Sequence, residues 1–396
     1  MNKSCLIGFL MCSAFSLVVQ AATDGAHITK TISQIERKKG IKRTIQYRPD
    51  GNDFVCVNGK NRYTRALYGG ITDFRIETSD RPVFATYKPK DSKHICFRLQ
   101  CGNQSIALDS LKFCEARYRA GRRTYRLTDP LLGKGELNIS VLAFPDAEGG
   151  IWRFTMKDMP EGALLHCYIS EIRAKNLSRN GDMGADRADS FDAPQLPKEQ
   201  KHYKLSLDGT TAYIVVEDQE LRLPALVEGT SLYDKSEKWR SEIESSLQIS
   251  TPDPYFNPLG GALAAAADGI WDGKIWLHGA IGWRSQLNGW RAAYIGDFIG
   301  WHDRARTHFD SYAASQVTDV PATIPHPTQD TALHLARSVK KWGTPHYSNG
   351  YICRTPYRKD QMHHYDMNLC YIDELLWHFN WTGDLDYVRK MWLVLT

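Results

Sequence analysis

The stretch NLCYIDELLWHFNWTGDLDYVRKMWLVLT, residues 368–396, reads as two consecutive amphipathic helices. Its large apolar residues recur at intervals of three and four, which places them on one face of a helix. They are Leu369, Ile372, Leu376 and Phe379 in the first half, and Leu385, Val388, Trp392 and Leu395 in the second. Between the halves, Gly383 suits the left-handed conformation that ends a helix, and Asp384 can cap the next helix. The stretch therefore predicts a helical hairpin.

A hairpin of two helices cannot bury its own apolar faces. The second apolar stripe is still in register at Thr396, and neither Gly, Pro nor a polar run ends the helix there. We therefore expect more helices after Thr396 and interpret the chain as a C-terminally truncated fragment. The second stripe would then be exposed, which favours aggregation or degradation.

Composition and charge are those of an ordinary soluble globular protein, with 42% hydrophobic and 24% charged residues. The net charge of +5 comes from 50 basic and 45 acidic residues without a long Lys/Arg run, which argues against a nucleic-acid partner. One local arginine cluster is interpreted as the solvent face of a strand pair: Arg117, Arg119, Arg122, Arg123 and Arg126.

Residues 1–21 have the features of a cleavable signal peptide: Lys3, an apolar run over residues 6–19, and small residues ending at Ala21. The run is too short to span a membrane, so we expect a periplasmic or secreted protein. Seven cysteines remain after cleavage, an odd number, so at least one thiol lacks an intrachain partner. Disulfides among Cys96, Cys101 and Cys114 and simple burial of these residues both remain open.

The pattern over residues 22–232 has a period of two. Trp152, Phe154 and Met156 alternate with polar residues, as half-buried strands require. Asn58 and Gly59 between two apolar runs predict a β-hairpin. We therefore expect an antiparallel β-sandwich. The acidic residues 180–192 are interpreted as a solvated loop rather than a calcium site, since their spacing misses that of a calcium-binding helix-loop-helix.

The period then becomes helical. Trp239, Ile243 and Leu247 at four-residue intervals predict a linker helix within residues 233–257. Residues 258–396 follow as a helical domain, with an alanine-rich helix over residues 260–268 and a helix capped by Thr328.

Aromatic and polar side chains interleave over residues 271–301, with five tryptophans: Trp271, Trp276, Trp283, Trp290 and Trp301. A sugar ring stacks its C–H face on an indole while its hydroxyls bind charged groups, so this pattern favours a sugar-binding site over an aromatic core. Trp283, Arg284, Trp290 and His302 are the predicted sugar-binding residues, and Asp297 and Asp303 are the acidic residues close to them.

A second polar group, His363-His364-Tyr365-Asp366, precedes the first helix of the hairpin. Asp366 suits the N-cap of that helix, and His364 and Asp366 can also line a substrate site. Neither His363/His364 nor His302/Asp303 has the i, i+4 spacing that places two ligands on one helical face, so no metal site is predicted. Phosphate-binding loops and nucleophile elbows are absent from the sequence, and no cofactor is predicted.

The segment Trp381-Thr382-Gly383-Asp384, followed by Tyr387-Val388 and Trp392, resembles the Thr-Gly-Asp hairpin of six-hairpin glycosidases with an (α/α)6 barrel. The order of β-sandwich, linker helix and helices matches theirs. The resemblance is to the α-L-rhamnosidase-like group, nearest to uncharacterised secreted members from polysaccharide-degrading bacteria. It implies that residues 258–396 are the first part of an (α/α)6 barrel, and that the chain acts on polysaccharide-derived oligosaccharides.

The resemblance also implies catalytic carboxylates in an early barrel loop. Arg284-Ser285-Gln286, Gly289-Trp290 and Gly296-Asp297 are a loose counterpart of that loop, with Gln286 where a carboxylate is expected. The predicted general acid therefore becomes Asp297 or Asp303, and the second carboxylate that glycoside hydrolysis needs is not identified.

Two alternatives to a glycoside hydrolase remain open. In a polysaccharide lyase, Tyr365 and His364 would abstract a proton beside a uronate carboxylate that Arg284 or Arg291 neutralises. In a non-catalytic glycan-binding protein, the same aromatic loop would only capture an oligosaccharide. The sequence indicates no oligomeric state.

Overall fold

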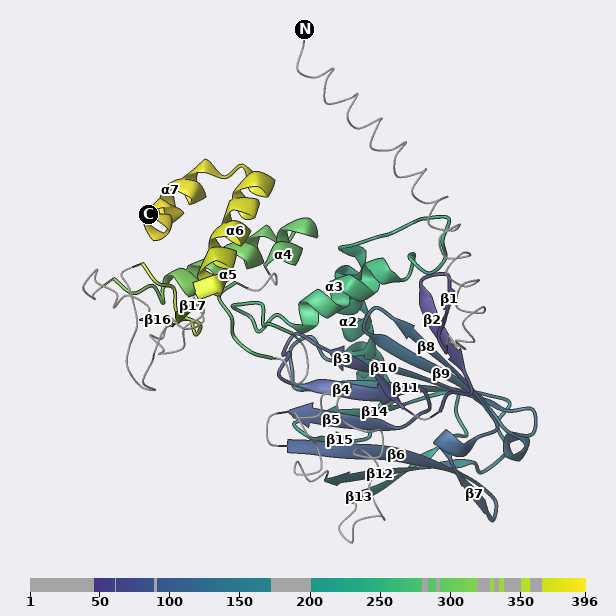
Figure 1. The fold of residues 1–396 in the computed structure, drawn as a ribbon. Helices are drawn as coiled ribbons and strands as arrows, with labels where there is room; N and C mark the ends of the chain where they lie inside the picture. The colour runs from purple at the N-terminus through teal and green to yellow at the C-terminus, as the bar shows by residue number, and fades with distance from the viewer. Residues whose placement is uncertain are drawn as a thin grey trace.

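The computed structural model describes residues 46–60, 62–88, 91–171, 201–279, 284–289, 293–318, 328–330, 335–337, 350–356 and 365–396. Two antiparallel β-sheets are followed by helices (Figure 1). The signal peptide, the acidic residues 180–192, Trp283, Trp290, Arg291 and His364 lie outside the described residues. No helix within the described ranges is long and apolar enough to cross a membrane.

The first sheet has the strand order β1-β2-β8-β9-β10-β11-β14-β15. Its strands are β1 (Arg48–Asp50), β2 (Asp53–Val57), β8 (Phe113–Arg119), β9 (Arg122–Thr128), β10 (Glu136–Ala143), β11 (Gly149–Lys157), β14 (Thr211–Glu217) and β15 (Glu220–Arg222). The second sheet has the order β13-β12-β6-β5-β4-β3, with β7 paired to β6. Its strands are β3 (Tyr63–Tyr68), β4 (Arg75–Ser79), β5 (Phe84–Lys88), β6 (Asp91–Cys101), β7 (Gln104–Ala107), β12 (Leu164–Glu171) and β13 (Lys201–Ser206).

The core of this region lies between the two sheets. On β11, Trp152, Phe154 and Met156 are buried while Arg153 and Thr155 are only half-buried, so the predicted alternation is confirmed. The ring of Phe84 on the opposite sheet meets Trp152 edge to face, with ring centroids 5.6 Å apart. Residues of both sheets form one continuous hydrophobic cluster, as expected for a sandwich.

The hairpin predicted at Asn58-Gly59 is wrong. Strand β2 pairs with β1 and β8, whereas β3 pairs with β4 in the other sheet, so the turn carries the chain from one sheet to the other. Asn58 does adopt a positive φ of 49°, and its side-chain oxygen accepts a hydrogen bond from the Cys114 N–H at 2.9 Å. The positive φ was therefore predicted correctly for Asn58 but not for Gly59, and it does not decide which strands pair.

The arginine cluster is only in part a solvent face. Arg123 is buried, and its guanidinium donates to the Tyr47 hydroxyl at 2.8 Å and to the Ser79 carbonyl at 2.9 Å. Arg119 and Arg122 pair with glutamates of the following helix, at 2.7 Å each. The charges of Arg119 and Arg122 are therefore neutralised by glutamates of the same chain.

Within the part of the chain that the structure describes, Cys56, Cys96, Cys101, Cys114 and Cys167 have free thiols. Cys114 is buried, and burial raises the pKa of its thiol to about 12. The disulfide interpretation for Cys96, Cys101 and Cys114 is therefore wrong, and burial explains Cys114.

The helices follow the sandwich: α2 (Leu226–Ser245), α3 (Leu259–Gly269), α4 (Tyr294–Phe298), α5 (His302–Ala313), α6 (Tyr365–Thr382) and α7 (Leu385–Leu395). Figure 1 shows α2 and α3 against the sandwich and α4 to α7 grouped beyond them. The predicted linker helix is α2, which begins at Leu226 and buries Tyr233 against the first sheet. The predicted alanine-rich helix is α3.

The helix predicted from Thr328 is wrong. Its first part is β16 (Thr328–Asp330), which pairs antiparallel with β17 (Leu335–Arg337). Apolar spacing in so short a segment does not separate a helix from paired strands.

The helical hairpin at residues 365–395 is confirmed as α6 and α7. Gly383 between them has φ 63°, and the Asp384 carboxylate accepts the Tyr387 N–H at 3.0 Å, as a cap does. The apolar stripe of α6 is not its packed face, because Leu369 and Leu376 are exposed. Leu385 and Trp392 of α7 are exposed, as predicted for the second stripe. Both helices carry apolar residues on more than one face, so the spacing of these residues could not identify the packed face.

Candidate functional site

A polar cleft lies between the start of α5 and the turn that joins α6 to α7. Its volume is about 410 Å³, and its lining residues are Gly300, His302, Asp303, Arg306, Trp381, Thr382 and Asp384. Two segments that are about eighty residues apart in the chain therefore meet here. The turn is the Trp-Thr-Gly-Asp segment that the sequence analysis identified as a helix boundary and as the motif of the family resemblance.

Two carboxylates of the cleft bind one guanidinium. Arg306 donates to Asp303 on its own helix and to Asp384 across the cleft, the latter at 3.1 Å. The side chain of Asp303 is 92% exposed, so it is open to an incoming molecule. The Tyr387 N–H, and then Arg306, hold the pKa of Asp384 below its usual value, which keeps this carboxylate ionised.

An indole borders the same cleft. Trp381 is 51% exposed and meets the ring of Phe298 edge to face, with centroids 6.3 Å apart. Packing fixes one edge of the indole while part of its surface remains open to solvent. Such a half-exposed indole next to carboxylates can stack on the C–H face of a sugar ring.

A buried carboxylate lies behind the cleft. Asp297 is at the end of α4, where Gly296 lets the backbone approach the Trp276 indole; a Cβ on Gly296 would lie 2.2 Å from that ring. The Asp297 carboxylate contacts Nδ1 of His302 at 2.7 Å and Nδ1 of His378 at 2.9 Å. His302 is 39% exposed, so its imidazole connects Asp297 to the cleft.

The predicted site residues therefore fall in different places. Asp303 and His302 line the cleft, and Asp297 lies directly behind His302. Arg284 does not join them. Its guanidinium donates to the Gly269 carbonyl and the Thr72 hydroxyl, each at 2.8 Å, and fastens the helical part to the sandwich.

Asp366 lies at the other end of α6 from the cleft. At 1.5 Å per residue, it is about 22 Å along the helix axis from Trp381, so the two cannot share one sugar-binding site. The helix begins at Tyr365, which places Asp366 within its first turn rather than at the N-cap. A carboxylate there still interacts favourably with the helix dipole.

The aromatic segment is partly core, as the alternative interpretation held. Trp276 is fully buried and packs against Trp271 and His308, with ring centroids 4.8 and 5.9 Å away. Burial lowers the pKa of His308 to about 3, so this imidazole stays neutral. Sequence reasoning missed Arg306, Trp381, Asp384 and His378 as site residues. The Trp-Thr-Gly-Asp signal could have identified two of them, had the turn been considered as a surface as well as a stop.

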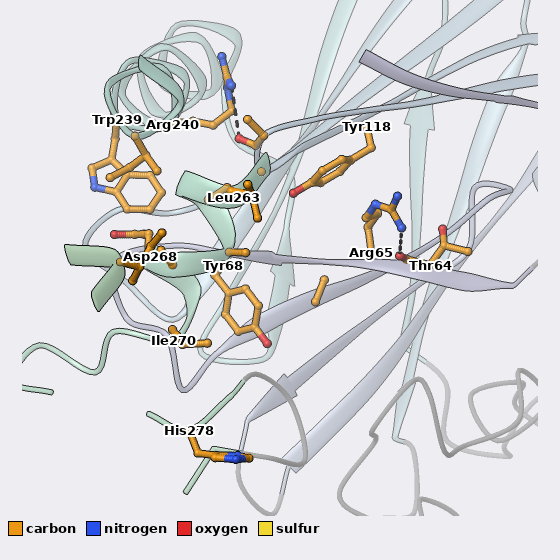
Figure 2. A pocket seen from close by; sticks show the side chains of 18 residues that line it. Thr64, Arg65, Tyr68, Tyr118, Trp239, Arg240, Leu263, Asp268, Ile270 and His278 are labelled. Atoms are coloured by element: carbon orange, nitrogen blue, oxygen red, sulfur yellow. Dashed lines mark hydrogen bonds between the residues drawn. The ribbon is translucent and has the colours of Figure 1, made fainter. Parts of the chain in front are cut away.

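A second, larger cavity of about 590 Å³ lies where α2 and α3 meet the sandwich. Figure 2 shows Tyr118 of the sandwich opposite Leu263 of α3, with Trp239 of α2 nearby. Among its lining residues Asp268 is the one carboxylate, and it binds Arg304 at 2.7 Å. The cavity therefore lacks the pair of carboxyl groups found in the polar cleft.

Comparisons with known proteins find a family whose model is similar to part of the sandwich. The model of a domain of unknown function, DUF4450, matches residues 89–216. Curated proteins gave no match to the sequence. Among solved structures, a bacterial glucoamylase complexed with acarbose matches at 9% identity and a TM-score of 0.39. The match covers 70% of this chain and 53% of the glucoamylase, so the chain spans about half the length of that enzyme.

Proposed function

We propose that the protein is an exported glycoside hydrolase of the six-hairpin type, acting on oligosaccharides derived from plant or microbial polysaccharides. The observation that carries this proposal is the pair of carboxylates, Asp303 and Asp384, held on Arg306 beside the half-exposed Trp381. Glycoside hydrolysis uses two carboxyl groups roughly 5 to 9.5 Å apart. Two carboxylates that share one guanidinium lie close enough for this spacing.

The two carboxylates have different environments, which suggests different roles. Asp384 is kept ionised by the Tyr387 N–H and suits the group that activates water or attacks the anomeric carbon. Asp303 is the other carboxyl group of the cleft, and we assign to it the role of the general acid that protonates the leaving oxygen. Trp381 would stack on the sugar ring, and His302 would bind a hydroxyl. Asp297 acts through His302 as a positioning residue, since it is buried behind that ring.

The two alternative functions have less support. For a lyase, Arg284 or Arg291 would neutralise a uronate. The Arg284 guanidinium already binds Gly269, Thr72 and Asp73, and Arg291 lies outside the described residues. For a non-catalytic glycan-binding protein, an exposed indole is enough and no carboxylate pair is needed. The proposed export rests on residues 1–21, and the proposed barrel on the resemblance of the α6–α7 turn.

The test is hydrolysis of a panel of p-nitrophenyl glycosides, together with reducing-end release from polysaccharide digests. We expect Asp303→Asn and Asp384→Asn each to lower kcat by about 10²- to 10⁴-fold. Asn also caps helices well, so Asp384→Asn removes the charge and keeps α7 capped. Trp381→Ala should chiefly raise KM.

The matched control is Asp386→Asn. Asp386 is an exposed carboxylate two residues from Asp384 that pairs with Arg389 outside the cleft, so activity should stay unchanged. A lyase forms products with a new double bond, which absorb ultraviolet light. Detection of such products would show that the reaction is lyase cleavage and not hydrolysis. Oligosaccharide binding without turnover by the unaltered protein would reduce the cleft to a binding site.

A further inference from the structure

Three side chains that ligate metals in other proteins converge behind the cleft. Asp297 from the end of α4, His302 from the start of α5 and His378 from α6 each offer a ligand atom, and these atoms lie within 4.8 Å of one another. The Asp297 carboxylate oxygens face Nδ1 of His378 at 2.9 and 3.0 Å, and one faces Nδ1 of His302 at 2.7 Å. The cluster joins three elements, which is why spacing within one element did not reveal it.

Hydrogen bonding alone leaves this cluster incompletely satisfied. His378 is fully buried, and its Nε2 has no hydrogen-bond partner among the described residues. If Nδ1 carries the proton toward Asp297, the lone pair on Nε2 is buried without a donor, which costs free energy. Aromatic rings surround His378, with Tyr387 perpendicular to it at a centroid distance of 5.3 Å. An electron-rich ring face suits an N–H better than a lone pair.

A cation between the three side chains removes this difficulty. With the proton on Nε2, the Nδ1 lone pair of His378 faces the carboxylate, and these two would repel unless a positive charge lies between them. A tetrahedral ion about 2.1 Å from each ligand separates the ligand atoms by roughly 3.4 Å. The carboxylate–imidazole contacts would open by about 0.4 to 0.7 Å, and the two imidazole nitrogens would approach by at most about 1.4 Å.

We propose that Asp297, His302 and His378 bind one divalent transition-metal ion of the zinc class. Two imidazoles and one carboxylate suit Zn²⁺ and its neighbours better than Mg²⁺ or Ca²⁺, which prefer oxygen ligands. Three protein ligands leave a further position, and His302 lines the polar cleft, so that position faces the cleft. The inference does not depend on the proposed hydrolase, because metal binding is measured without turnover.

The test is titration of chelator-treated full chain with Zn²⁺ by calorimetry. We expect one Zn²⁺ per chain and a rise in Tm, since binding to the folded state stabilises it. His302→Ala should weaken binding by more than about 100-fold, because losing a direct ligand exceeds the loss from an outer-shell partner. His302 is partly exposed, so this variant spares the core.

The matched control removes a different pair of histidines. His166 and His202 of the sandwich stack with 2.9 Å between ring nitrogens, and they are the obvious rival for adventitious Zn²⁺. His202→Ala should leave the affinity unchanged. The proposal is overturned if this variant loses the binding, if His302→Ala keeps it, or if the unaltered chain shows no saturable binding.

Variants of the buried ligands Asp297 and His378 can unfold, so a second measurement tests the ligand set without altering these two residues. Co²⁺ bound to the unaltered chain should give visible absorption typical of a nitrogen- and oxygen-ligated tetrahedral site, and His302→Ala should abolish it. Co²⁺ absorption that persists in His302→Ala would also overturn the assignment.

Discussion

The sandwich and the group of helices α4 to α7 bury polar side chains in different surroundings. In the sandwich, Arg123 is enclosed and bonded to the Tyr47 hydroxyl and the Ser79 carbonyl, so it contributes to the fold alone. In the helices, Asp297 and His378 are just as buried, but their partner His302 opens on a cleft. The comparison teaches that a buried charge indicates function only when one of its partners reaches a surface where a ligand can enter.

The two regions also differ in how far they bury their large apolar side chains. The sandwich encloses Trp152 and Phe84 between its sheets, whereas Trp392 and Leu393 of α7 are 58% and 82% exposed. The predicted exposure of apolar residues on the hairpin is therefore confirmed, although partly for other residues than expected. Both regions have a buried core, but α7 also has an apolar surface that is open to solvent.

The largest expected effect contrasts two tryptophans. Trp152→Ala should lower the free energy of unfolding by about 3–5 kcal/mol, because it empties the centre of the sandwich core. Trp392→Ala should change it by less than about 0.5 kcal/mol, because the indole lies on the surface. Urea unfolding followed by circular dichroism measures both. If both variants lost the same free energy of unfolding, the predicted difference between the two regions would be wrong.

The next effect is a pH dependence of the free energy of unfolding, which arises from a histidine in the sandwich. His94 is buried, neither ring nitrogen has a hydrogen-bond partner among the residues that the structure describes, and burial lowers the pKa of His94 to about 4. The unfolded chain titrates near 6.5, so it binds more protons than the folded chain between these values. Stability should be fully present above pH 6.5 and fall by about 3 kcal/mol as the pH drops to 4.

The variant His94→Leu isolates this effect. It removes the titrating group and two unpaired nitrogens, so the acid limb of the stability curve should flatten between pH 6.5 and 4. Urea unfolding at a series of pH values gives the curve. An unchanged acid limb would assign the dependence to another buried imidazole, such as His308 in the helices.

The smallest effect concerns the turn of the helical hairpin. Gly383→Ala places a Cβ at φ 63°, where no other atom lies within 4 Å, so the cost is conformational and about 1 kcal/mol. Gly383→Asn should cost less, because Asn tolerates this conformation. Thermal unfolding of the two variants ranks them. A larger loss for Asn than for Ala would mean that side-chain volume matters at the turn.

Local signals in the sequence predicted local structure well. Alternation identified β11 because a strand between two sheets buries every second residue, and Gly383 and Asp384 marked a helix boundary that depends on a few neighbouring atoms. Pairing failed at Asn58 and the packed face failed at Leu369, because both depend on partners far along the chain. The site divides in the same way. His302 and Asp303 were found as neighbours in the sequence, whereas His378 and Arg306 belong to it only through tertiary contacts.

Asp384 serves the fold and the cleft with the same carboxylate, since it caps α7 and accepts from Arg306. Under the proposed function, selection on such a residue acts twice, on folding and on chemistry. Among variants that arise by chance, most substitutions would be removed for poor folding before their chemistry is ever exposed to selection. Asn is the substitution that separates the two, because it keeps the cap and gives up the charge. A lineage that no longer needed the chemistry would therefore be free to drift from Asp to Asn at this position without losing the hairpin.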